Sequence, residues 1–124
     1  MRIVISLVLV AVTTFLGYWM VLDERKHSQA IAYNERGNVL SELKRYDEAI
    51  EHYQQAITLY PSFAKAHNNL GSTLAQQGRF EEAAEHFEKA INIDPNYIDA
   101  RKNLELAHAL AGKKCSAPIR QEFR

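Results

Sequence analysis

The 124-residue chain has only one cysteine and no net charge, and each of these two features excludes a class of protein. A lone Cys115 can form no disulfide within the chain and has no partners at metal-ligand spacing, which excludes a disulfide-stabilised scaffold. Fifteen basic and fifteen acidic residues leave a formal charge of zero. This balance provides no dominant attraction to nucleic acid, so we expect no nucleic-acid partner.

The sequence also lacks a set of side chains that would make a catalytic or metal site. His27, His67 and His108 have no partner four residues away, as a helical metal site requires, and His52 and His86 lie 34 residues apart. No nucleophile, base and orienting group can be named together. We therefore expect no enzyme activity, no metal and no cofactor.

What the sequence does contain is a long apolar segment near its N-terminus. Residues 3–22 read IVISLVLVAVTTFLGYWMVL and carry no charge. As a helix they would rise about 30 Å, the thickness of the hydrocarbon core of a bilayer. Tyr18 and Trp19 stand at the end that would meet the membrane interface, and the charged sequence DERK follows at once. We predict a single-pass membrane anchor with its flank over residues 1–27.

Two other interpretations of this segment stay open. A cleaved secretory signal has a shorter apolar stretch and small residues at its cleavage site, whereas Tyr18, Trp19 and Met20 are bulky. Cleavage would leave a free secreted module. A buried core helix would need protein on every side. The side of the membrane is undetermined, because Arg2 and the amino terminus balance Arg25 and Lys26.

The rest of the chain repeats itself after 34 residues. Segment 30–63 aligns without a gap on segment 64–97, and thirteen positions are identical. The matching positions preserve small, aromatic and proline residues: Gly37 and Gly71, Ala49 and Ala83, Tyr53 and Phe87, Ala56 and Ala90, Pro61 and Pro95. Such a period predicts stacked supersecondary units that bury a shared core.

Each unit is predicted to form two antiparallel helices. In the second unit, apolar residues recur at helical spacing over residues 66–74 and again over 80–91. Between them lies Gly78, which can adopt the left-handed conformation that ends a helix. Because Gly71 is small, we expect the two helices to approach closely and Phe87 to fill the space between them.

These residues resemble the tetratricopeptide repeat family, which has the same period and the same order of small, large, small and proline residues. The second unit matches at Leu70, Gly71, Leu74, Ala83, Phe87, Ala90 and Pro95. In the first unit Arg36 replaces the usual apolar residue, which an uncovered first helix tolerates. The resemblance implies an all-α fold of antiparallel helix hairpins, an α-solenoid, behind the N-terminal transmembrane helix.

The repeat register continues as one further helix. Leu104 matches the pattern, but Glu105 stands where Gly37 and Gly71 stand, and a glutamate is too bulky for close helix approach. We predict a capping helix with no partner. The expected organisation is a tetratricopeptide domain over 28–114, with repeats 30–63 and 64–97 and a capping helix 98–111, followed by a polar tail 115–124.

The joint between the anchor and the first repeat contains neither glycine nor proline from Leu22 to Tyr33. The anchor therefore enters the repeat either as one long helix or through a short frayed joint.

The resemblance implies that the first helix of each pair lines a concave groove. Beside the buried stripe these helices carry mostly amides, which both donate and accept hydrogen bonds and suit the backbone of an extended peptide. The predicted protein-binding groove is Asn34, Asn38, Lys65, Asn68, Asn69, Ser72, Gln76, Lys102, Asn103 and Leu106, with Ile31 and Ser41 on the same side. The alternative is a solvated helix face that binds nothing.

Some members of the family hold the C-terminal carboxylates of heat-shock chaperones with lysines, asparagines and a further basic residue. Here Asn38 and Asn69 match the asparagines, but Asn34, Asp99 and Asn103 occupy the basic positions. Without those cations a doubly charged terminus gains little. We expect no chaperone clamp.

Two functions follow as hypotheses. The first is a membrane-tethered adaptor or scaffold that captures a peptide or helix of a partner protein in the groove. The second is a self-assembling structural protein, a homo-oligomer that uses the exposed side of the capping helix and the tail, at Leu106, Leu110, Ile119 and Phe123.

Overall fold

The structure is a computed structural model that describes residues 1–115. Over these residues it contains helices and no strands, which confirms the all-α class predicted from the sequence. The helices are α1 (Arg2–Glu42), α2 (Tyr46–Leu59), α3 (Ala64–Gln76), α4 (Phe80–Ile93) and α5 (Ile98–Cys115). Ile119 and Phe123, which the sequence suggested for self-assembly, lie outside the described residues.

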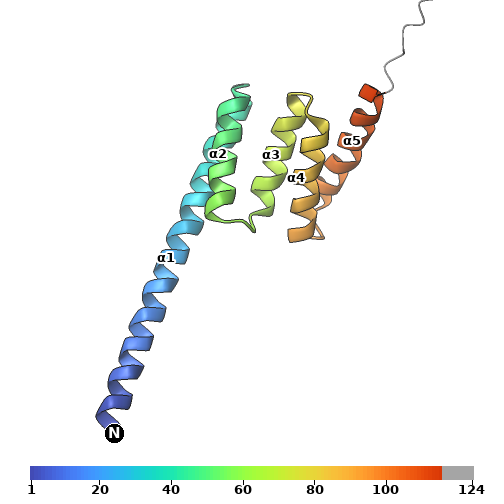
Figure 1. The fold of residues 1–124 in the computed structure, drawn as a ribbon. Helices are drawn as coiled ribbons and strands as arrows, with labels where there is room; N and C mark the ends of the chain where they lie inside the picture. The colour runs from blue at the N-terminus through green and yellow to red at the C-terminus, as the bar shows by residue number, and fades with distance from the viewer. Residues whose placement is uncertain (116–124) are drawn as a thin grey trace, which may run out of the picture.

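The helices form two antiparallel pairs and a single cap (Figure 1). The C-terminal part of α1 pairs with α2, α3 pairs with α4, and α5 packs against α4. The N-terminal half of α1 projects away from this stack without touching another helix (Figure 1). The arrangement is that of stacked helix hairpins in which each unit contacts its neighbours.

Each pair is closed by an aromatic ring that lies directly over a glycine. A Cβ atom built on Gly37 would lie 2.6 Å from Cε1 of Tyr53, and one on Gly71 would lie 2.7 Å from Cε1 of Phe87. Both distances are far below ordinary van der Waals contact, so only glycine permits the observed separation of the helices. The predicted role of Gly71 and Phe87 is confirmed.

The core continues from one unit to the next. Tyr53 and Phe87 share one cluster with Leu70 and Leu74 from α3 and Ala107 from α5. All five side chains are at most 3 % exposed. Because this cluster takes residues from four helices, neither repeat buries its apolar face alone.

The turn inside each pair uses the same left-handed backbone position. Gly78 has φ +75°, as the sequence predicted, and Lys44, which precedes it by one repeat, has φ +58°. A side chain in this conformation costs free energy that glycine does not incur. The first repeat therefore holds a strained residue where the second does not.

Helix α1 runs unbroken from Arg2 to Glu42, so the joint is a continuous helix rather than a frayed one. Residues 1–21 are all exposed. Among the described residues α1 alone is long and apolar enough to cross a membrane by length and composition, a test that signal sequences also pass.

The cap is longer than the sequence indicated. Helix α5 extends to Cys115 rather than to residue 111, and so includes the first residue assigned to the tail. Lys113 and Lys114 are good helix formers, and the first proline beyond them is Pro118, which explains the extension. Glu105 is exposed, in agreement with its expected position on an uncovered face.

Candidate protein-binding groove

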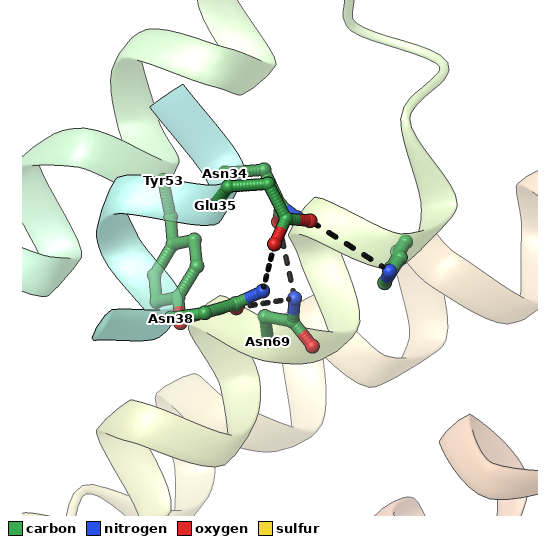
Figure 2. A network of polar contacts seen from close by, with 6 residues as sticks. Asn34, Glu35, Asn38, Tyr53 and Asn69 are labelled. Carbon is green, nitrogen blue, oxygen red and sulfur yellow. Dashed lines mark hydrogen bonds and ion pairs between the residues drawn. The ribbon is translucent and has the colours of Figure 1, made fainter. Parts of the chain in front are cut away.

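The amides of the first helices bind one another across the repeats. The Nδ2 of Asn69 donates to Oδ1 of Asn34 and to Oδ1 of Asn38, each at 3.0 Å, and so links α3 to α1 (Figure 2). The Nδ2 of Asn103 donates to Oδ1 of Asn68 at 3.0 Å and links α5 to α3. We call these bonds the amide ladder.

The ladder uses the same positions at both interfaces. Asn34 and Asn68 are equivalent in the repeat, as are Asn69 and Asn103, so the Asn69–Asn34 and Asn103–Asn68 bonds each join residues 35 apart. The Asn69–Asn38 bond is present only at the first interface. Asn34 is 1 % exposed and Asn68 8 %, and buried amides of this kind are costly unless they are hydrogen-bonded. Their first role is therefore to hold the stack in register.

The asparagines of the ladder are replaced by charged residues at each end of the array of repeats. At the start, the position of Asn69 is held by Glu35, whose carboxylate accepts from Nδ2 of Asn34 at 3.3 Å. At the end, the position of Asn34 is held by Lys102, which has no acceptor to offer a further helix. Both substitutions fit terminal units of a short stack.

Tyr53 connects the core to the ladder. Its ring covers Gly37, and its hydroxyl donates to Oδ1 of Asn38 at 2.9 Å (Figure 2). Burial raises the pKa of the hydroxyl above its ordinary value, and the carboxylates of Glu35 and Glu42 act in the same direction. The tyrosine is therefore a fixed hydrogen-bond donor at neutral pH.

Beside the ladder lies a cleft of about 340 Å³ between α1 and α3, which we call the α1–α3 cleft. At one side Oγ of Ser41 meets Oγ1 of Thr73 at 3.3 Å, and that threonine donates to the carbonyl of Asn69 at 3.0 Å. The lining residues are Asn38, Ser41, Glu42, Tyr53, Lys65, Asn69, Ser72 and Thr73.

Several polar groups in the cleft form no hydrogen bond within the ladder. The Nζ of Lys65 has a single ion pair, 3.9 Å from Glu35 with both side chains well exposed, which is a weak interaction. Among the side chains that the structure describes, residues 1–113, none forms a hydrogen bond with Oδ1 of Asn69 or with the hydroxyl of Ser72. A cation, an acceptor and a hydroxyl thus face the same space, with Glu42 at its rim.

The structure brings together four of the predicted groove residues: Asn38, Lys65, Asn69 and Ser72 line the cleft. The other predicted residues lie elsewhere. Asn34 and Asn68 are buried in the ladder, and Asn103 is a half-buried member of it. Three side chains are exposed outside the cleft, namely Gln76, Lys102 and Leu106.

Sequence reasoning missed three residues of the cleft. Tyr53 was assigned only to the core, because its ring fills the space over a glycine. Thr73 lies one helical turn after Asn69, and this spacing was a signal that could have identified it. Glu42 gave no signal, because a charged residue at a helix end is ordinary.

A second repeated contact joins the two helices of each pair on their other side. The rings of Tyr33 and His52 stack at 5.8 Å, and those of His67 and His86, their equivalents in the next repeat, stack at 5.6 Å. Burial lowers the pKa of His86 to about 4, and the charge of Lys89 acts in the same direction. Residues 1–113 contain no group of three ligands that could hold a metal.

The repeated contacts can be compared with known proteins. The family model described as "Tetratricopeptide repeat" matches residues 28–96, more than half of the chain. The chain belongs to the tetratricopeptide repeat family. No curated protein matches the sequence.

Solved structures of tetratricopeptide domains have the same fold. The second such domain of Spaghetti, bound to the HSP90 peptide SRMEEVD, is 28 % identical with a TM-score of 0.70, over 73 % of this chain and 83 % of that one. The TPR2B domain of yeast Sti1, in complex with an Hsp70 peptide, is 26 % identical with a TM-score of 0.67, over 73 % and 72 %. MamA is 31 % identical with a TM-score of 0.67, over 73 % of this chain but half of its own length.

Proposed function

We propose that this protein is a membrane-tethered adaptor whose α1–α3 cleft captures an extended peptide or a helix of a partner protein. The observation that carries the proposal is the set of polar groups in the cleft that the amide ladder leaves free: Lys65, Ser72 and Oδ1 of Asn69. An acceptor beside a hydroxyl and an ammonium group matches the alternating donors and acceptors of a peptide backbone.

Family membership supports this proposal. Tetratricopeptide repeats are generally non-catalytic scaffolds for protein interactions, and two of the similar structures have peptides bound. The described residues of this chain assemble no nucleophile with a base, so the proposed role is binding without catalysis.

The charges of the cleft favour a ligand without an acidic terminus. Lys65 is the one cation that lines it, and Glu42 offsets this charge. At two positions where a carboxylate clamp needs cations, Asn34 is buried in the ladder and Asn103 is bonded to Asn68. We infer that the partner presents a neutral or mixed-charge segment.

The tether is proposed from the first half of α1. Residues 3–22 are apolar on every side of the helix, and residues 3–21 are all exposed. Exposure of this apolar surface to water costs a free energy of roughly 25 cal/mol for each Å², whereas a bilayer would bury the surface. A mature N-terminus beyond residue 20 in mass spectrometry would instead identify a cleaved signal, and protease protection of intact vesicles would give the side of the membrane.

The test is a peptide selection on the full chain in detergent micelles, followed by affinity measurements on variants. Ser72→Arg should fill the cleft and lower the affinity for a selected peptide by about tenfold or more, a loss of ~1.4 kcal/mol in binding free energy. The matched control, Gln54→Arg, adds the same charge on the exposed side of α2 and should leave affinity unchanged. The acidic peptide SRMEEVD should not bind. Equal affinity in both variants would exclude the cleft as the binding site.

The ladder asparagines are unsuitable for this test, because they stabilise the stack and their loss would confuse binding with folding. Circular dichroism should therefore accompany each cleft variant and show an unchanged helix content.

A second candidate function is self-assembly, and two observations favour it. Leu106 on α5 is 58 % exposed, and the outer face of α1 and α2 has a hollow of about 500 Å³ beside Tyr33 and Arg36. Exposed apolar surface of this kind marks interaction sites. Light scattering of the full chain should show a mass that rises with protein concentration if this function is correct, and a constant monomer mass would exclude it.

A further inference from the structure

Two turns of the repeat domain lie at the end of the stack from which the anchor emerges (Figure 1). The first joins α2 to α3, and the second joins α4 to α5. Each helix pair is antiparallel, so alternate turns must fall at the same end. The side chains of interest there are Tyr60 and Phe63 in the first turn, and Ile93, Tyr97 and Ile98 at the second. We call this set the lower edge.

The first turn is held beside α1 close to the end of its apolar segment. The ring of His27 lies 4.6 Å from that of Tyr60 and 6.5 Å from that of Phe63. His27 follows Leu22 by five residues, which is about 7.5 Å along a helix. The polar region on each side of a bilayer is roughly 5–8 Å thick. A bilayer whose hydrocarbon ends at Leu22 therefore brings its headgroups to this turn.

No hinge can move the edge away from that level, because α1 is one helix through the whole joint. The second turn lies farther from α1 at the same end of the stack (Figure 1). Transmembrane helices tilt by about 20° on average, and a tilt of α1 toward α5 lowers the second turn onto the bilayer.

The uncovered surface of the edge is mixed, because two isoleucines are exposed beside exposed polar residues of the same turn, among them Asn96. Ile98 is 63 % exposed and Ile93 38 %. Tyr60, Phe63 and Tyr97 are half-buried aromatic residues, of the kind found at membrane interfaces. Charge does not add to the attraction. Asp94 and Asp99 are acidic, and the guanidinium of Arg101 donates to the carbonyl of Pro95 at 2.7 Å.

We propose that the lower edge rests on the bilayer that α1 spans, with its aromatic and isoleucine side chains among the lipid headgroups. The contact is apolar and needs no anionic lipid. This inference rests on the proposed tether and adds to it a fixed orientation of the domain on the membrane surface.

The test uses tryptophan reporters in the full chain, reconstituted in phosphatidylcholine vesicles with brominated acyl chains that quench tryptophan emission. In a Trp19→Phe background, Ile98→Trp places the reporter on the lower edge. Leu43→Trp is the matched control, because Leu43 is 62 % exposed in the turn at the opposite end of the stack. Circular dichroism checks that both variants fold.

The reporter at position 98 should lose part of its emission in brominated vesicles, because it lies at the level of the headgroups beside the acyl chains, and the reporter at position 43 should lose none. The unmodified chain, in which Trp19 is the sole tryptophan, tests the tether separately. Quenching of Trp19 without quenching at position 98 would overturn the lower edge and leave the tether intact. Absence of quenching at Trp19 would overturn both.

Two further outcomes would overturn the inference. Equal quenching at positions 98 and 43 would mean that the domain has no fixed orientation. Quenching at position 98 that required phosphatidylglycerol and disappeared in high salt would indicate an electrostatic contact instead of an apolar one.

Discussion

The first repeat, residues 30–63, and the second, 64–97, align without a gap, yet they are buried differently. The second repeat is covered on both sides and buries Leu70 and His67 in α3. The first is covered on one side only, and the equivalents of these residues, Arg36 and Tyr33, are exposed and half-buried. The comparison shows that position in the array, rather than the repeat itself, decides which side chains a unit can hold.

Substitution of the two interhelical glycines, one in each repeat, should produce the largest difference in stability between the repeats. We expect Gly71→Ala to lower the free energy of unfolding by about 2–3 kcal/mol, because a Cβ there would meet the Phe87 ring and also the backbone oxygen of Ala83 at 3.0 Å. We expect Gly37→Ala to cost about 1 kcal/mol, because the three nearest atoms to its Cβ all belong to the ring of Tyr53 and none to the backbone. Chemical denaturation followed by circular dichroism measures both.

Gly112→Ala is the control for this pair, because a Cβ there meets nothing within 4 Å. It should leave stability unchanged or slightly raised, since alanine favours helix. A cost at Gly37 equal to that at Gly71 would mean that the Ala83 backbone does not limit the second pair.

Acid should destabilise the protein through the histidine stack of the second repeat. Burial holds the pKa of His86 at about 4 in the folded protein, against about 6.5 in an unfolded chain. Between these values the unfolded state binds more protons, so stability falls as the pH drops from 6.5 toward 4. The expected loss is about 2 kcal/mol, after allowance for solvent screening of a half-buried ring.

Thermal unfolding at pH 7 and pH 4.5 checks this expectation. His86→Gln should have a smaller difference between the two pH values than the parent protein. Its stability at pH 7 gives the separate cost of lost packing. An unchanged pH difference in this variant would assign the acid sensitivity to other groups.

The amide ladder should contribute unequally at the two interfaces. Asn69→Ala removes two hydrogen bonds and should cost about 1.5–2 kcal/mol, whereas Asn103→Ala removes one and should cost about 1 kcal/mol. The double variant Asn34→Ala with Asn69→Ala should cost less than the sum of its parts, since the two residues are partners. Additive losses would show that the ladder bond does not stabilise the stack.

The smallest effect should come from the left-handed turn residue. Lys44→Gly should stabilise the protein by about 0.5–1 kcal/mol, because glycine relieves the strain at φ +58°. The reverse change, Gly78→Lys, should destabilise it by a similar amount. A loss of stability in Lys44→Gly would mean that the lysine makes a compensating contact.

The fold was largely predictable from the sequence, because the 34-residue period and the spacing of Gly71 and Phe87 determine how helices pair. The family and the all-α class are confirmed. The domain boundaries stay a prediction, although the family model begins at residue 28. The end of α5 was placed too early, at residue 111, whereas the helix continues to Cys115.

The candidate groove was less predictable. The sequence identified the amides but not that Asn34 and Asn69 bind each other, because a pairing 35 residues apart depends on the stagger between neighbouring hairpins. That stagger is a property of the packed stack and is not encoded in the period. The hydroxyl of Tyr53 was missed for a similar reason, since its direction depends on how the ring lies over Gly37.

The unbroken course of α1 has a consequence for any partner of the proposed tethered protein. Ser41, at the cleft, follows Leu22 by nineteen residues, which is about 28 Å of helix. Because the helix has no flexible joint between these residues, the membrane segment determines both the distance of the cleft from the bilayer and the direction in which the cleft faces. A partner anchored in the same membrane would have to present its ligand segment at this same distance from the bilayer. Rotation of the membrane segment about its helix axis would rotate the cleft by the same angle.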